Sequence, residues 1–380
     1  MRAGRIRLLP EGVVNRIAAG EVIERPAAAA RELIENALDA GASRIAVAIE
    51  GGGVGRIEIV DDGCGMSAEE LSLAVQRHAT SKLTDDSLIR IATLGFRGEA
   101  LPSIGAAARL VITSRPAGAD SAAAITVEGG IVGPVAPAAG PVGTRVVVSD
   151  LFFATPARRK FLKSSRSEAE ATEAATRRLA LAAPSVAVRF ASDNRVAFDL
   201  PASTRSARVS ALLGAEAAAA LLPVEARRGT LQLSGFAAAP LVSRATAAAQ
   251  ALIVNGRPVA DPLLRMAVRV AYRDVLPAGR HAVVALYLDL PPEELDVNVH
   301  PAKAEVRFRD PEAVRGLVIG ALSRALGGGA GRVAPAPRPP LRLVHPPAAT
   351  APAGFAEPIL PLGTAPGARS HGPLAAAPEP

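Results

Sequence analysis

Residues 26–41 read Pro-Ala-Ala-Ala-Ala-Arg-Glu-Leu-Ile-Glu-Asn-Ala-Leu-Asp-Ala-Gly, the most informative run in the chain. Proline is favoured in the first turn of a helix and glycine just past its end, so this run predicts a helix with well-marked ends. At roughly 100° per residue, its side chains separate into two faces. The apolar face contains Leu33, Ile34, Ala37 and Leu38. The polar face contains Glu32, Glu35, Asn36 and Asp39.

Two side chains of the polar face have the chemistry of a catalytic site. Glu32 and Asn36 are four residues apart and therefore point the same way. A carboxylate can polarise water, and an amide oxygen beside it can ligate Mg²⁺. The alternative is an ordinary solvated helix face, so the catalytic interpretation requires a nucleotide site close by.

The sequence that follows the helix supplies candidates for that site. A predicted strand at residues 57–60 runs into Asp61-Asp-Gly63-Cys-Gly65, where the glycines allow tight backbone turns. Asp61, at the strand end, could accept a hydrogen bond from an adenine amino group. An ordinary acidic turn would give the same string. Ser67 and Glu70 then predict a capping box for the next helix.

Glycine-rich segments further along are candidates for phosphate binding. Residues 77–82 read Arg-His-Ala-Thr-Ser-Lys, and residues 95–101 read Gly-Phe-Arg-Gly-Glu-Ala-Leu. A glycine-punctuated loop leading into a helix can offer backbone N–H groups to phosphate oxygens, with Lys82 and Arg97 adding positive charge. A flexible surface loop is the alternative. Thr144, which follows Gly143 at the start of an apolar strand, could place a hydroxyl near a base.

Length and composition limit the classes of protein to consider. A chain of 380 residues exceeds what one hydrophobic core usually serves, which favours two domains. The net charge of +7 favours an anionic partner, although an Ala/Arg-rich composition accounts for it equally well. The single cysteine, Cys64, excludes an internal disulfide framework and a Cys-cluster zinc site. With no signal peptide and no apolar run of about 18 residues, a cytoplasmic protein without a membrane partner is expected.

The chain divides into three predicted regions. From Ile17 to about Leu200, helical and strand patterns alternate, with strands at 45–49 and 57–60, and predict an α/β layered domain over residues 1–200. A polar stretch at 201–208 marks the boundary to a second predicted domain, at 205–326. Its strands are expected at 231–236, 251–254 and 282–290. Residues 327–380, rich in Gly, Pro and Ala, are expected to form a disordered linker toward a missing partner domain.

Six motifs in unbroken order together resemble the MutL family of DNA mismatch repair proteins, over roughly residues 5–326. They are Ile-Ala-Ala-Gly-Glu-Val-Ile-Glu-Arg-Pro at 17–26, Glu-Leu-Ile-Glu-Asn at 32–36, Asp-Asp-Gly-Cys-Gly at 61–65, Gly-Phe-Arg-Gly-Glu-Ala-Leu at 95–101, Thr-Pro-Ala-Arg-Arg-Lys at 155–160 and Asp-Val-Asn-Val-His-Pro-Ala-Lys at 296–303. MutL proteins belong to the GHKL ATPase superfamily, which lacks a P-loop, and this sequence has no P-loop string. The resemblance implies a two-layer α/β sandwich of the GHKL type, followed by an α+β domain of the small-ribosomal-protein type.

The resemblance also implies roles for individual residues in binding ATP and Mg²⁺. Glu32 would be the general base and Asn36 the Mg²⁺ ligand, with Lys303 reaching from the second domain to the γ-phosphate. The residues near the adenine base would be Asp61, Gly63, Gly65 and Thr144. A mobile lid would include Thr80, Ser81 and Lys82. The phosphate pocket would be lined by Gly95, Arg97, Gly98, Glu99 and Leu101.

Partners are likewise implied by the resemblance. They are DNA, bound without regard to sequence, a mismatch-recognition protein of the MutS type, and a downstream helicase or nuclease. ATP would make two N-terminal halves pair, and slow hydrolysis would reset this switch in a bacterial cytoplasm, at the nucleoid when engaged on DNA. The basic residues expected to contact DNA are Arg158, Arg159, Lys160, Arg257, Arg265 and Arg269, for which a solvated basic face is the alternative. The family's C-terminal dimerisation and endonuclease domain is not expected in this chain.

Two other functions remain alternatives. One is a type II topoisomerase ATPase subunit, which shares the GHKL site but is disfavoured by the motifs at 95–101 and 296–303. The other is a scaffold that binds nucleotide without hydrolysing it. The presence of Glu32 favours hydrolysis over the scaffold.

Overall fold

The computed structural model describes residues 19–20, 22–80, 94–95, 98–297 and 305–329. Expectations for Ser81, Lys82, Arg97 and Lys303, and for the linker beyond residue 329, therefore lie outside the described residues. No helix in the described part of the chain is long and apolar enough to cross a membrane.

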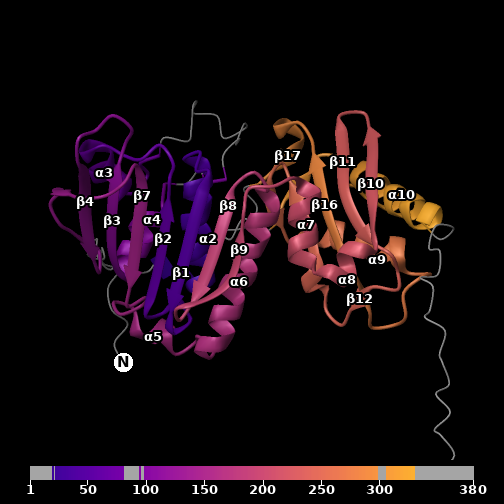
Figure 1. The fold of residues 1–380 in the computed structure, drawn as a ribbon, viewed down its shortest axis with the longest axis horizontal. Coiled ribbons are helices and arrows are strands. Elements are labelled where there is room, and N and C mark those ends of the chain that lie inside the picture. The colour runs from indigo at the N-terminus through magenta and orange to yellow at the C-terminus, as the bar shows by residue number, and fades with distance from the viewer. Residues whose placement is uncertain (1–18, 21, 81–93, 96–97, 298–304, 330–380) are drawn as a thin grey trace, which may run out of the picture. The chain divides into compact units, whose positions relative to one another are not determined.

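A nine-stranded mixed sheet forms the first part of the fold (Figure 1). Its strand order is β5-β4-β3-β7-β2-β1-β8-β9, and β6 also pairs with β4. The strand bounds are β1 Arg44–Glu50, β2 Arg56–Asp61, β3 Arg109–Arg115, β4 Ala122–Glu128, β5 Ile131–Val132, β6 Ala136–Ala138, β7 Gly143–Ser149, β8 Ala187–Ser192 and β9 Arg195–Leu200. Neighbouring strands are antiparallel except β1 and β8. The strands predicted at 45–49 and 57–60 are confirmed as β1 and β2.

Helices pack against this sheet and close its hydrophobic core. Their bounds are α2 Pro26–Asp39, α3 Ala68–Ala74, α4 Ala100–Ala107 and α6 Ser165–Ala182, with a 3-10 turn η1 at Gly51–Gly53. The short helix α5 Pro156–Arg159 has no buried residue. Alternate residues of the central strands, such as Ile57 and Ile59, are buried with apolar side chains of α2 and α4. The result is the predicted α/β layered arrangement, with α2 and α6 in direct contact.

The apolar face predicted for α2 is confirmed, whereas the predicted polar face is wrong at one residue. Leu33, Ile34 and Ala37 are buried in the core, as the helical period predicts. Glu35, however, was expected on the polar face and is completely buried. Its carboxylate accepts a hydrogen bond from Arg31 Nε at 2.8 Å. The period of the helix could not show that other elements would cover part of the polar face.

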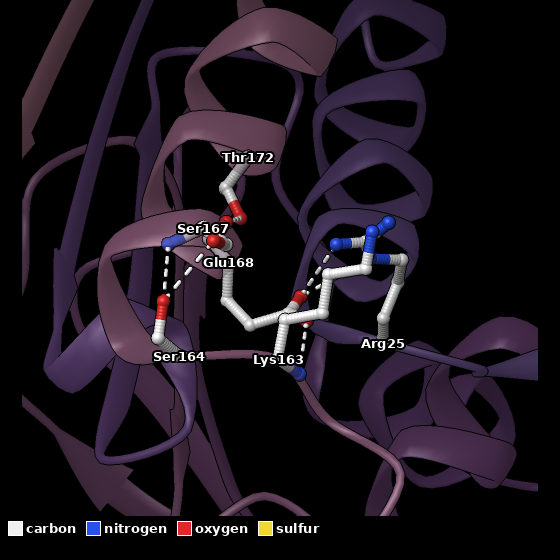
Figure 2. Close-up of polar contacts among 6 residues, drawn as sticks. All are labelled: Arg25, Lys163, Ser164, Ser167, Glu168 and Thr172. Carbon is white, nitrogen blue, oxygen red and sulfur yellow. Dashed lines mark hydrogen bonds and ion pairs between the residues drawn. The ribbon is translucent and has the colours of Figure 1, made fainter. Parts of the chain in front are cut away.

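A buried carboxylate joins the start of α2 to α6 (Figure 2). Glu168, in the first turn of α6, accepts hydrogen bonds from Arg25 Nε and Nη2 at 3.1 and 2.9 Å. Its other oxygen accepts the backbone N–H of Lys163 at 3.0 Å. Thr172 Oγ1 donates to the Glu168 carbonyl one turn later, and Ser164 caps the helix. The beginning of α2 is therefore fixed to the segment that follows the 155–160 motif.

A second sheet of five strands follows, and Figure 1 labels its strands β10, β11 and β16. The strand order is β10-β11-β16-β13-β14. The bounds are β10 Leu221–Arg228, β11 Leu231–Ala238, β13 Gln250–Val254, β14 Arg257–Val259 and β16 Val284–Asp289, with helices α7 Arg205–Leu213, α8 Ala215–Ala219, α9 Pro262–Tyr272 and α10 Pro311–Gly329. Two short pairs join β12 Ser243–Arg244 to β15 His281–Ala282, and β17 Leu295–Asp296 to β18 Arg307–Phe308. The strands predicted at 231–236, 251–254 and 282–290 are confirmed as β11, β13 and β16.

Both faces of this second sheet are covered. Leu252 and Val254 of β13 pack with α9 and α10, whereas Ala251 and Ile253 pack with α7 and the end of α6. This alternation explains why the predicted strand is apolar throughout.

Buried polar contacts join α6 to the elements after it. The Arg208 guanidinium, on α7, is 1% exposed and donates to the carbonyl oxygens of Ala180, Pro184, Val186 and Pro201 at 2.7–3.0 Å. The hydroxyl of Tyr287, on β16, donates to Leu181 O at 3.0 Å. Burial raises the pKa of Tyr287 to about 12, so this hydroxyl remains a donor.

Candidate functional site

The candidate base-recognition residues meet at one end of the first sheet. Asp61 ends β2 and lies directly opposite Thr144 of β7 in the strand register. Its Oδ1 accepts the N–H of Gly63 at 2.9 Å. Burial raises the pKa of the Asp61 carboxyl, and backbone N–H groups of Gly63 and Thr144 oppose that shift. The sequence placed Asp61 and Thr144 near one ligand, and the sheet brings them side by side.

Ser114, on β3, is a part of this site that sequence reasoning missed. Its side chain is 1% exposed. Its Oγ accepts the Met66 N–H at 2.8 Å and lies 2.8 Å from Thr144 Oγ1 and 3.1 Å from Gly143 O. The Thr144 hydroxyl is thereby fixed. Ser114 resembles any serine in a strand until the register of β3 and β7 is known.

Glycines let backbone segments touch around Asp61. A Cβ on Gly65, whose φ is +70°, would lie 2.2 Å from Arg115 O. A Cβ on Gly143, whose φ is +114°, would lie 2.1 Å from Asp61 O. A Cβ on Gly63 would lie 2.8 Å from the Cβ of Ala40, the residue after α2. The loop at 61–65 therefore packs directly against the end of the helix that carries Glu32 and Asn36.

The exposed remainder of the polar face of α2 meets the second glycine motif. Glu32, Asn36 and Asp39 are all partly exposed. The Asp39 carboxylate accepts the N–H of Leu94 on Oδ1 and that of Gly95 on Oδ2, both at 2.9 Å. The start of the 95–101 motif is therefore held at the last turn of α2, three residues beyond Asn36.

The described parts of the two candidate phosphate motifs also touch. Gly98 has a φ of +61°, and a Cβ there would lie 2.5 Å from Ala79 O. Glu99, which precedes α4, places a carboxylate oxygen 3.9 Å from His78 Nδ1. Leu101 is half-buried against the core and Thr80 is partly exposed. This places the 77–80 and 98–101 segments together beside the start of α4.

The six basic residues expected to contact DNA fall into three groups. Arg159 and Lys160 are exposed on and after α5, and Arg265 and Arg269 are exposed on α9. Arg158 is half-buried, and its Nη1 donates to Ile23 O at 3.4 Å.

Arg257 differs from the expectation. It is 4% exposed, and its Nη1 donates to Leu94 O at 2.9 Å. Because its side chain is buried in this contact, Arg257 is not among the exposed candidates for contacts with DNA. The sequence alone gave no sign that β14 lies beside Leu94.

Asn36 is the residue of α2 that the sequence offers as a Mg²⁺ ligand. Among the described residues, no three His, Cys, Asp or Glu side chains gather closely enough to hold a metal ion. Mg²⁺ in phosphate sites is usually held by one or two protein oxygens together with phosphates and water. A single amide oxygen such as that of Asn36 is consistent with this kind of site.

Comparison with known proteins identifies the family of a chain with this geometry. Residues 24–129 match the model of the histidine kinase-, DNA gyrase B- and HSP90-like ATPases, and residues 209–327 match that of the DNA mismatch repair protein C-terminal domain. Over 321 residues, the chain is 63% identical to the DNA mismatch repair protein MutL of Acidiphilium cryptum, strain JF-5. The chain belongs to the MutL family. Over 327 residues it is 58% identical to MutL of Rhodospirillum rubrum.

These MutL relatives are longer than the present chain. The alignments cover 84% of this chain but 55% and 52% of the two relatives, so the chain spans about half the length of the curated relatives it matches.

Solved structures support the fold. The Aquifex aeolicus MutL ATPase domain complexed with ADP aligns with a TM-score of 0.56 at 26% identity, covering 78% of this chain and 98% of that one. The N-terminal domain of a DNA repair protein aligns with a TM-score of 0.72 at 24% identity, covering 84% and 99%.

Proposed function

We propose that this chain is the ATP-driven switch of a MutL mismatch repair protein, which binds DNA and hydrolyses ATP slowly in the presence of Mg²⁺. The observation that carries the proposal is the packing of the 61–65 loop against the end of α2. It brings a buried carboxylate suited to an adenine amino group close to the helix that carries Glu32 and Asn36. The A. aeolicus ATPase domain, a structural relative, has been solved with ADP.

Each residue of this site would have a distinct task. Asp61 would accept a hydrogen bond from the adenine amino group, with Thr144 held beside it by Ser114. Backbone N–H groups near Gly98 and the start of α4 would meet the phosphates, because helix starts and glycine turns favour anions. Glu32 would orient the attacking water and accept its proton. Asn36 would hold Mg²⁺, which neutralises charge on the phosphate oxygens.

Other elements of the switch are part of the same proposal. Thr80, Ser81 and Lys82 would belong to a lid, Gly95, Arg97, Glu99 and Leu101 to the phosphate pocket, and Lys303 would reach the γ-phosphate. ATP binding would pair two N-terminal halves, and hydrolysis would release them.

The remaining parts would serve DNA and protein partners. The five-stranded sheet with α9 and α10 supports an α+β domain of the small-ribosomal-protein type from residue 205, after an ATPase domain at 1–200. Helix α10 continues to Gly329, three residues into the linker expected at 327–380, so the proposed linker begins after that helix. Arg159, Lys160, Arg265 and Arg269 are the exposed candidates for contacts with DNA phosphates. A MutS-type protein and a downstream helicase or nuclease would be the protein partners, in a bacterial cytoplasm.

The proposal is tested by steady-state ATP hydrolysis with Mg²⁺, with and without single-stranded DNA. Glu32→Ala should lower turnover by about 10²-fold or more while ATP still binds, because a general base contributes about 10²–10⁴-fold. Asn36→Ala should weaken Mg²⁺-dependent nucleotide binding as well as turnover. Arg195→Ala, an exposed arginine on β9, is the control and should behave as wild type.

The outcomes separate the switch from a non-hydrolysing scaffold. Turnover that is absent in the wild type, although ATP binds, would favour the scaffold. Turnover that survives in Glu32→Ala would contradict the role of Glu32 even though family membership stands. A type II topoisomerase subunit is not favoured, because the long alignments are to MutL proteins.

A further inference from the structure

Arg257 makes a contact that links two distant parts of the chain. It begins β14 in the second sheet, yet it donates a hydrogen bond at 2.9 Å to the carbonyl of Leu94, 163 residues earlier. The Arg257 side chain is only 4% exposed and Leu94 is half-buried, so the donor of this hydrogen bond is largely shielded from water. A shielded hydrogen bond from a charged donor is stronger and more directional than an exposed one.

The segment that Arg257 contacts is also held from its other side. The N–H groups of Leu94 and Gly95 donate to the two carboxylate oxygens of Asp39, both at 2.9 Å. Leu94 is thus held by α2 through its N–H and by β14 through its carbonyl. Any shift of Arg257 relative to α2 must strain or break one of these bonds.

The charged side chains of α2 stabilise the Arg257 guanidinium in this particular location. Burial lowers the pKa of the Arg257 guanidinium, while the carboxylates of Glu35, Glu32 and Asp39 on α2 favour its charged form and Arg31 opposes it. A guanidinium remains charged in proteins at neutral pH. A buried charge is costly unless it is paired, so Arg257 is stable only where α2 presents these carboxylates.

Helix α9 follows Arg257 almost directly. Strand β14 ends at Val259, and the helix begins at Pro262. Asp261 is 5% exposed and caps α9 by accepting the Leu264 N–H at 3.0 Å, which fixes the first turn of the helix directly after β14. Arg265 and Arg269 are exposed on this same helix. A force on α9 is therefore transmitted to Arg257 over a few residues.

We propose that Arg257 is a positioning residue that couples DNA contact on α9 to the ATP site, by holding Leu94 and Gly95 in register with Asp39 at the end of α2. The coupling rests on the proposed function, because it presumes an ATP site beside α2 and DNA phosphates at α9. DNA bound to Arg265 and Arg269 shifts β14, and Arg257 passes that shift to the backbone that begins the 95–101 motif.

The test compares Arg257→Lys and Arg257→Ala with Arg273→Ala. Lysine keeps the positive charge but lacks the planar fork of arginine. Arg273 lies at the end of the same helix, is exposed and forms an ion pair with its neighbour Asp274, so it is a control from the same helix. Two quantities are measured on the full chain. One is the ratio of turnover with single-stranded DNA to turnover without it, and the other is backbone hydrogen exchange in the peptide containing residues 94–95.

In Arg257→Lys, the turnover ratio should fall toward one, and the 94–95 amides should exchange faster and no longer respond to DNA. In Arg257→Ala, kcat should fall roughly ten- to hundredfold, as loss of one charge-assisted buried hydrogen bond implies, with a smaller change in KM. A purely structural role would lower the active fraction but leave the ratio unchanged, and Arg273→Ala should retain the wild-type ratio.

The proposal is overturned if Arg257→Lys keeps both the wild-type ratio and the wild-type exchange response. Hydrogen exchange can be measured without ATP turnover. It therefore tests the coupling through Arg257 separately from the proposed ATPase function. A wild-type chain that hydrolyses no ATP contradicts the proposed ATPase. If its 94–95 amides still respond to DNA through Arg257, the coupling stands.

Discussion

Asp61 and Asp62 are adjacent carboxylates whose pKa values shift in opposite directions in the folded protein. Asp61 is buried, and that burial raises its pKa above 3.8 despite hydrogen bonds from Gly63 and Thr144. Asp62 is exposed, and although desolvation acts to raise its pKa, hydrogen bonds from Ser43 and Arg44 outweigh it and hold the pKa below 3.8. The Asp62 carboxylate accepts both backbone N–H groups and the Ser43 hydroxyl at 2.6–2.7 Å. One carboxyl is therefore suited to a ligand and the other to fixing the start of β1.

The two positions predict opposite pH dependences of stability. A raised pKa in the folded state gives stability that is present below 3.8 and lost as pH rises through the folded pKa. Wild type should therefore lose stability relative to Asp61→Asn as pH rises above 3.8. A lowered pKa in the folded state gives stability that is lost as pH falls. The free energy of unfolding of the wild type should therefore rise relative to that of Asp62→Asn as pH rises toward 3.8. Denaturant unfolding at several pH values measures both slopes, and slopes of the same sign would contradict this assignment.

For individual residues, the sequence identifies candidate functional side chains better than it predicts their burial and contacts. The candidates Asp61, Thr144, Glu32 and Asn36 are selected from motifs, and their roles come from the family resemblance. The structure places Asp61 opposite Thr144, and their roles in binding ATP remain predictions. The burial of Glu35 and Arg257 and the contacts of Ser114 could not be predicted. Each depends on an element far away in the sequence, and helical or strand periodicity describes only the element itself.

Short glycine segments decide how closely the elements of the first sheet approach one another. Gly143 begins β7 where the backbone of Asp61 passes, and no side chain fits between them. The elements themselves were largely predictable, because α2, β2 and β13 have strong periodic patterns and clear end signals. Strand order was not, since nothing local in the sequence shows that β1 pairs with β8 in parallel.

Gly143→Ala should be far more damaging than a similar change elsewhere. Its Cβ would lie 2.1 Å from Asp61 O, at a φ of +114°. We expect a loss of about 3 kcal/mol or more in the free energy of unfolding, together with weaker ATP binding. Gly118→Ala is the matched control, because its φ is +83° but no heavy atom lies within 4 Å, so only about 1–2 kcal/mol of backbone strain is expected. Equal losses in thermal or denaturant unfolding would show that the close approach is unimportant.

For the molecule as a whole, the net charge of +7 does not show which basic residues contact DNA phosphates. Exposed arginines and lysines occur on several elements, among them α5, α9 and β9. Only those that displace counterions from phosphates affect the salt dependence of binding.

Salt dependence therefore locates the DNA surface. Lys160→Ala should lower the slope of log affinity against log salt by about 0.7–0.9, the value for one phosphate contact. Arg269→Ala should do the same, whereas Arg195→Ala on β9 should leave the slope unchanged. The measurement is a titration of fluorescent DNA at several salt concentrations. An unchanged slope in Lys160→Ala would place that residue on a solvated face.

The ion pair between Arg25 and Glu168 has a consequence for synthesis. A cation at the start of a helix opposes the helix dipole, so Arg25 favours α2 only once a carboxylate accompanies it. That carboxylate emerges from the ribosome 143 residues later. At about 5–20 residues per second, this is a delay of roughly 7–30 s. The helix that carries Glu32 and Asn36 is thus among the first segments made, but its start is fixed only after Glu168 has been made.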